Sequence, residues 1–221
     1  MTSTLGTVRN AARISRQPTF PFSSTEAFTD GIYAIAATLL VLDLRPPNVE
    51  PGDLASTLGD EWFLFLVYGL GFLQMAGGWS ILRRLRTWAP TVDYYVVLLT
   101  LLIIAPFALE PFTLALLSES RGNADDFATA LQVAAGALLA SLAAYIATFE
   151  YLHRRKFFRD DLDPDIFTLA HRISKIIWLL PALTLILAPF LGTWAAVPLL
   201  IHLVLMLMPI DAMPRTPVGP S

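Results

Sequence analysis

Long apolar segments recur along the chain and are separated by shorter polar stretches. We expect these segments to form six helices, over residues 26–45, 62–82, 93–117, 127–151, 170–190 and 192–209. Most of them supply the ~20 residues that cross the apolar core of a bilayer; the last is the shortest and contains Pro198. Barrel strands are excluded because the apolar residues do not alternate with polar ones. The pattern predicts an all-α integral membrane protein whose six-helix membrane domain covers residues 23–209.

The composition supports this prediction. The chain of 221 residues is 55% hydrophobic and only 15% charged, with a mean hydropathy of +0.60. Soluble domains carry about 25% charged residues, so much of this surface is expected to face lipid. The absence of cysteine excludes disulfides and thiolate chemistry. There is no phosphate-binding loop, nucleophile elbow or metal-ligand motif, so we expect no enzyme, no cofactor, no metal site and no nucleic-acid partner.

The positions of the basic residues predict the orientation. If both termini lie inside, all but two of the 15 basic residues, Arg45 and Arg121, fall in inside segments. This is the distribution that the positive-inside rule describes. We therefore expect a multi-pass protein of the cell membrane with cytoplasmic N and C termini. Residues 1–22 would be a basic cytoplasmic segment, residues 210–221 a flexible cytoplasmic tail, and the first apolar helix a retained anchor.

The first apolar segment opens with two acids. Ser23 and Glu26 have the spacing of a capping box, which predicts a helix beginning at Ser23. Asp30 lies one turn deeper, where an acid is costly unless it faces the bundle interior or water. An acid at the level of the lipid headgroups is the alternative explanation.

Two stripes of side chains follow along this helix. Small residues that permit close helix approach recur at one spacing, at Ala27, Gly31, Ala34 and Thr38. Large apolar residues recur at another, at Phe28, Ile35, Leu39 and Leu42. Taken by itself, the second stripe is most simply explained as part of a packed core.

The segment AFTDGIYAIAATLLVLDL resembles the first-span signature of the transmembrane-protein-175 family of potassium channels. In that signature an Arg is followed by Phe-Ser-Asp and an apolar helix, and Phe28, Thr29 and Asp30 match the Phe-Ser-Asp motif. The segment VDYYVVLLTLLIIAPFALEPFTLALL is similar to the third span of the family. The resemblance extends loosely over residues 24–209, and its specific part is the first span.

The resemblance implies a potassium-preferring cation channel in which four copies surround an axis lined by the first helices. Such channels use rings of apolar side chains in place of a carbonyl filter. Ile35 would form the main constriction, Leu39 and Leu42 would lie further out, and Thr38 would place a hydroxyl beside the ring. Apolar rings gate by dewetting, and a permeant ion sheds part of its water to pass. The implied partners are potassium ions and the lipid bilayer.

The chain departs from the family pattern at two places. Ser24 stands at the position of the family arginine, and residues 77–78 are glycines in the region where bacterial relatives carry histidines. Asp30 therefore needs another partner, for which we consider Arg83, Trp79 or a proton. These departures leave two alternatives open: a non-conducting membrane protein of the same fold, and a proton pathway through Asp30.

Acidic residues gather in the segments expected outside. They could form a vestibule that concentrates cations near a pore mouth, although solubility of the outer loops explains them equally well. The residues are Glu50, Asp53, Asp60, Glu61, Glu110, Glu119, Asp125 and Asp126.

Overall fold

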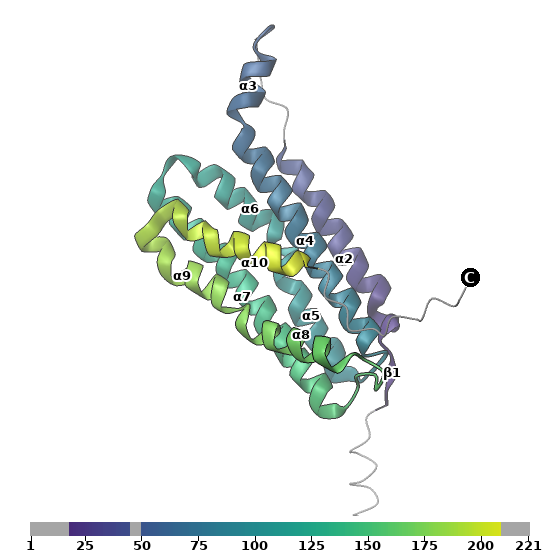
Figure 1. Ribbon diagram of the computed structural model, residues 1–221. Coiled ribbons are helices and arrows are strands. Elements are labelled where there is room, and N and C mark those ends of the chain that lie inside the picture. The colour runs from purple at the N-terminus through teal and green to yellow at the C-terminus, as the bar shows by residue number, and fades with distance from the viewer. Residues whose placement is uncertain (1–17, 45–49, 209–221) are drawn as a thin grey trace, which may run out of the picture.

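Helices build most of the described part of the chain in a computed structural model that describes residues 18–44 and 50–208 (Figure 1). The first span consists of the 3₁₀ turn η1 (Phe22–Thr25), α2 (Glu26–Leu39) and the 3₁₀ turn η2 (Leu40–Asp43). The remaining helices are α3 (Leu54–Asp60), α4 (Trp62–Trp88), α5 (Tyr94–Ala108), α6 (Glu110–Glu119), η3 (Ser120–Gly122), α7 (Ala124–Arg155), α8 (Pro164–Ile176), α9 (Leu179–Leu191), η4 (Gly192–Ala196) and α10 (Val197–Leu207). Two short strands, β1 (Phe20–Pro21) and β2 (Thr91–Val92), pair antiparallel.

Five segments in the described residues are long and apolar enough to cross a membrane: Phe22–Leu42, Trp62–Trp88, Tyr94–Gly122, Ala124–Arg155 and Pro164–Leu207. The first four correspond to the first four predicted spans. The fifth covers predicted span 170–190 and most of predicted span 192–209. Between these two spans the chain turns at Gly192, which has a φ of 51°, and α10 packs back against α9 and α4. With 11 residues, α10 rises only about 16 Å, which is roughly half of a bilayer core. The structure therefore has five to six apolar helices.

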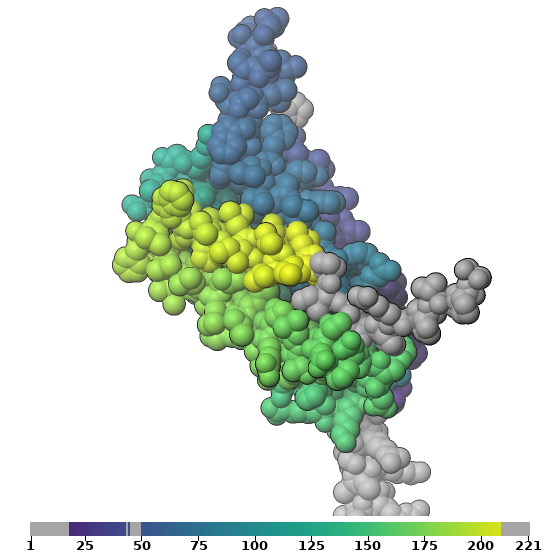
Figure 2. Space-filling view, viewed as in Figure 1, coloured from purple at the N-terminus to yellow at the C-terminus, as the bar shows by residue number. Residues whose placement is uncertain are grey.

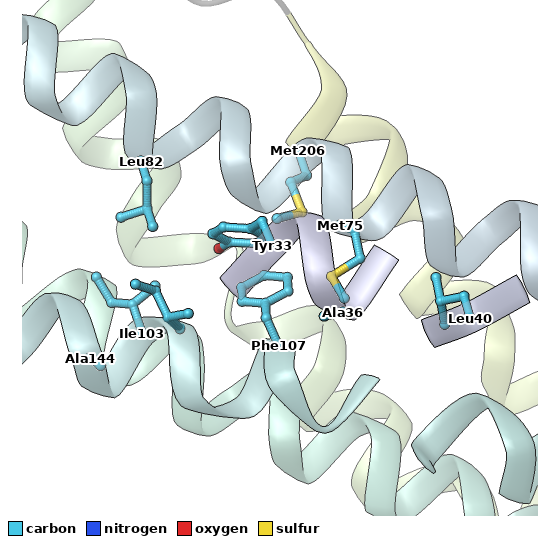
Figure 3. Packing of buried hydrophobic residues seen from close by; sticks show 10 residues of the cluster. Tyr33, Ala36, Leu40, Met75, Leu82, Ile103, Phe107, Ala144 and Met206 are labelled. Atoms are coloured by element: carbon cyan, nitrogen blue, oxygen red, sulfur yellow. The ribbon is translucent and has the colours of Figure 1, made fainter. Parts of the chain in front are cut away.

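The helices pack around α7, while α2 lies along one side of the bundle against α4, α5 and α6 (Figure 1). A central cluster joins α2 to four other helices (Figure 3). In this cluster the Tyr33 and Phe107 rings meet with their centroids 5.3 Å apart. The cluster fixes the face that α2 turns toward its own chain.

The Gly77–Gly78 pair permits the close packing of α4. A Cβ added at Gly78 would lie 2.5 Å from Cζ of Phe107, and one at Gly77 would lie 3.0 Å from Cγ of Met206. The distance at Gly78 is shorter than packed atoms tolerate, and the one at Gly77 would require the Met206 side chain to shift. The two positions that lack the family histidines are therefore filled by side chains from α5 and α10.

The start of α2 differs from the predicted capping box. The α-helix begins at Glu26 after η1, and Thr25 donates its hydroxyl proton to the Phe22 carbonyl without capping α2. Phe22 is buried, and the chain before it pairs with β2. The packed region thus starts before Ser23, the predicted domain boundary. Most of the predicted 1–22 segment and all of the predicted 210–221 tail lie outside the described residues.

At the end of the bundle where β1 and β2 pair, aspartate side chains cap two helices, α5 and α8. Asp93 is buried and accepts hydrogen bonds from the Tyr95 and Val96 amides, which caps α5, while the Tyr151 hydroxyl donates to its other oxygen at 2.7 Å. Asp163 caps α8 in the same way. These caps satisfy amides that a helix start leaves without intrahelical partners.

Candidate functional site

The two faces of α2 differ sharply in exposure. Thr29, Tyr33, Ala36 and Leu40 are buried against the rest of the chain. The large apolar side chains of the predicted stripe point away from it, with exposed fractions of 60% at Phe28, 62% at Ile35, 42% at Leu39 and 63% at Leu42. The explanation of this stripe as part of the chain's own core is therefore wrong. The stripe is an apolar surface that this chain leaves uncovered.

The end of the stripe has a different helical geometry from its beginning. The α-helix ends at Leu39, and Leu42 belongs to η2, where the helix is tighter and rises more per residue. The Thr38 hydroxyl donates to the Ile35 carbonyl at 2.8 Å. Its oxygen still has lone pairs that can accept a hydrogen bond, so Thr38 offers an acceptor beside Ile35.

Asp30 is bound to α4. The Trp79 indole donates to Asp30 Oδ1 at 2.9 Å, and Arg86 Nη2 lies 3.2 Å from the same oxygen. Trp79 was one of the predicted partners and is confirmed. Arg83 is not a partner of Asp30; its guanidinium lies over the Trp79 ring, 5.4 Å from the centroid. Asp30 therefore faces protein, as expected. Its positively charged partner is Arg86.

Arg86 contacts three residues of α2 at once. Its side chain is only 8% exposed, and Nη1 donates to the Thr29 hydroxyl at 2.7 Å. Glu26 lies 3.7 Å away as a third, weaker partner. Thr29 in turn donates to the Glu26 carbonyl. The basic group missing at Ser24 is thus replaced by one from the second span.

The three residues that match the Phe-Ser-Asp motif of the family occupy different environments. Phe28 is exposed on the stripe, Thr29 is buried with a 1% exposed fraction, and Asp30 lies between them with a 38% exposed side chain. Sequence reasoning missed Arg86. The available signal was the spacing of Trp79, Arg83 and Arg86, which places all three on neighbouring turns of one helix.

Glu110 does not belong with the acids of the predicted outer vestibule. It lines a cavity among leucine side chains, together with Gln74. The other acids of that set are exposed: Glu50, Asp53, Asp60, Glu61, Glu119, Asp125 and Asp126. Across the described residues no cluster of acids, histidines or cysteines could hold a metal ion.

Comparisons with known proteins connect this arrangement to a family of channels. Residues 25–111 match the family model described as the endosomal/lysosomal potassium channel TMEM175. A potassium channel of Streptomyces collinus is 36% identical over 95 residues, which cover 42% of this chain and 46% of the relative. This match thus spans about half of that curated relative. A potassium channel of Chamaesiphon minutus is 29% identical over 182 residues, covering 74% and 89%.

The proton channel TMEM175 of Gallus gallus is 31% identical over 117 residues, covering 49% of this chain and 23% of the relative. The crystal structure of a lysosomal potassium-selective channel TMEM175 homologue from Chamaesiphon minutus has the same fold. Its TM-score is 0.70 at 22% identity, with coverage of 83% of this chain and 95% of that one. The family is one of channels and not of enzymes. The matches confirm the resemblance carried by the first helix: residues 25–111 of this chain match the TMEM175 family model.

Proposed function

We propose that the chain forms a potassium-preferring channel in which four copies surround an axis lined by α2. The observation that carries this proposal is the exposed stripe of Phe28, Ile35, Leu39 and Leu42 on a helix whose opposite face is packed in the core. An apolar surface of this kind needs lipid, a partner or a pore on its outer side. The names of the bacterial relatives favour a pore.

In this arrangement Ile35 forms the main constriction, with Leu39 about 6 Å further along α2 and Leu42 beyond it. A ring of isoleucines excludes water unless an ion brings part of its hydration shell. Potassium holds this shell less tightly than sodium, which gives a modest preference for potassium. Thr38 accepts a hydrogen bond from the water that the ion retains.

Both termini lie in the cytoplasm in this proposal, and the protein resides in the cell membrane. Support comes from the basic residues at the ends of α4 and α7. Arg159, just after α7, donates its backbone amide to the Trp88 carbonyl at the end of α4, so these clusters share one end of the bundle. Basic clusters favour the cytoplasmic side.

The test is potassium flux into liposomes that contain the purified protein, the Ile35→Asn variant or the Ile186→Asn variant. Ile186 on α9 is a matched control because it is 64% exposed, like Ile35. An asparagine at Ile35 should wet the constriction, raising flux or weakening the preference for potassium over sodium. Ile186→Asn should leave both unchanged. Equal effects of the two variants on a protein shown to be folded would remove Ile35 from the pore.

A proton pathway through Asp30 is the second candidate, favoured by the name of the Gallus gallus relative. Two hydrogen-bond donors already hold Asp30 Oδ1, which favours an anchoring role over proton transfer. Asp30→Asn would abolish flux driven by a pH gradient if Asp30 carried the proton. Proton flux that survives in this variant while potassium flux persists would exclude the second candidate.

A further inference from the structure

A cavity of about 220 Å³ lies between α4, α6, α7 and α10, and no residue of α2 lines it. Its wall is mostly apolar, formed by residues such as Val67, Leu114, Leu131 and Leu203. An apolar cavity of roughly 150 Å³ is large enough to hold benzene. This cavity can therefore hold one aromatic ring with a short substituent.

Two polar side chains line this mostly apolar cavity. Glu110 comes from the start of α6 and Gln74 from the middle of α4, where it is only 9% exposed. Among the described residues, no protein group makes a hydrogen bond or ion pair with either side chain. An unpaired carboxylate in apolar surroundings is costly. A ligand with a positively charged group would give this partly buried carboxylate a partner.

The cavity reaches the surface of the molecule near α4 and α10. Leu66 on α4 and Leu200 on α10 both line the cavity and are both exposed. The two helices pack side by side on the face seen in Figure 2, which shows α10 in yellow. Because this rim is apolar, a ligand dissolved in the bilayer could enter without crossing a polar surface.

We propose that this cavity binds a small hydrophobic amine in its protonated form. The ammonium group donates to the Glu110 carboxylate and to the Gln74 side-chain carbonyl, and the apolar part contacts the leucines. The Glu110 contact is a charge-assisted hydrogen bond in a site of low dielectric, which is the strong kind. The cavity thus has the features of a ligand site: an apolar wall with a few convergent polar groups.

The test measures binding of benzylamine to the full chain in detergent by isothermal titration calorimetry, with benzyl alcohol as an uncharged probe of similar size. Benzylamine should bind more tightly than benzyl alcohol, and Glu110→Gln should weaken benzylamine binding at least about tenfold. Glu119→Gln makes the same charge change at an exposed position of the same helix and should leave binding unchanged. Ala134→Leu narrows the cavity and should weaken both probes.

Equal affinities for the two probes, or equal benzylamine binding in Glu110→Gln and Glu119→Gln, would overturn the proposal. Tighter binding of benzyl alcohol would also overturn it, because Glu110 would then act as a neutral acid. The measurement reads binding without ion flux. Its outcome is therefore independent of whether the chain conducts potassium.

Discussion

Replacing Arg86 by methionine removes the only guanidinium that contacts Asp30 in the described residues while keeping an unbranched apolar side chain about as long as the arginine stem. The charged hydrogen bond to Thr29 contributes about 1.5–3 kcal/mol. Asp30 and Glu26 have 38% and 47% exposed side chains, so solvent screens each ion pair to roughly 0–1 kcal/mol. Arg86 Nε is buried without a partner, and its removal offsets about 1 kcal/mol. The expected destabilisation is about 2 kcal/mol.

The free energy of unfolding is measured by denaturant titration of the purified protein in detergent. Arg83→Met is the control: it removes the same charge from an exposed site on the same helix, where the contact is a stacking one with Trp79. This control should cost less than about 1 kcal/mol. A double-mutant cycle between Arg86→Met and Asp30→Asn isolates the pair. If Arg86→Met unfolds with the wild-type free energy, or if Arg83→Met costs more, Arg86 is not the anchor of Asp30.

Two further predictions concern packing and charge. Gly78→Ala should destabilise the protein by about 1–3 kcal/mol, because its Cβ would overlap the Phe107 ring, whereas Gly31→Ala points into open space and should be tolerated; thermal unfolding of both variants checks this. Outside the membrane helices, the Arg159 guanidinium beside Asp161 lowers the pKa of that carboxyl. The folded protein therefore gains stability above the usual pKa of Asp161 and loses it as the pH falls through the lowered one. Carboxyl NMR should show the Asp161 pKa returning to its ordinary range in Arg159→Gln, and an unchanged titration would mean that the pair does not form.

Much of the fold could be predicted because the solvent is lipid. Continuous apolar runs identified the first four spans, since a helix must satisfy its own backbone in the membrane. The last two were harder to separate because α10 is short and follows a turn at Gly192. The buried face of α2 could not be predicted, because Tyr33 and Ile35 are both apolar, and hydropathy does not distinguish a core-facing residue from an exposed one when the helix is apolar on all sides.

The contacts of the acids were predicted less well than the helices, because each depends on residues distant in the sequence. Arg86 reaches Asp30 across 56 residues, so the signature of the first span contains no trace of it. Glu110 follows the break between α5 and α6, and it lines one cavity with Gln74, which lies on another helix. Its position near the outer end of the third predicted span placed it with the exposed acids.

The polar anchor and the exposed stripe are consequences of one helix orientation. Five residues separate Asp30 from Ile35, which at 3.6 residues per turn places their side chains about 140° apart around α2. Contacts of Asp30 and Thr29 with α4 therefore turn Ile35 away from the chain. A rotation of α2 that buried Ile35 would also pull Asp30 from Trp79 and leave Arg86 without its partners. Loss of the anchor and reorientation of the proposed pore surface are thus coupled, and a variant such as Arg86→Met should disturb ion flux as well as stability.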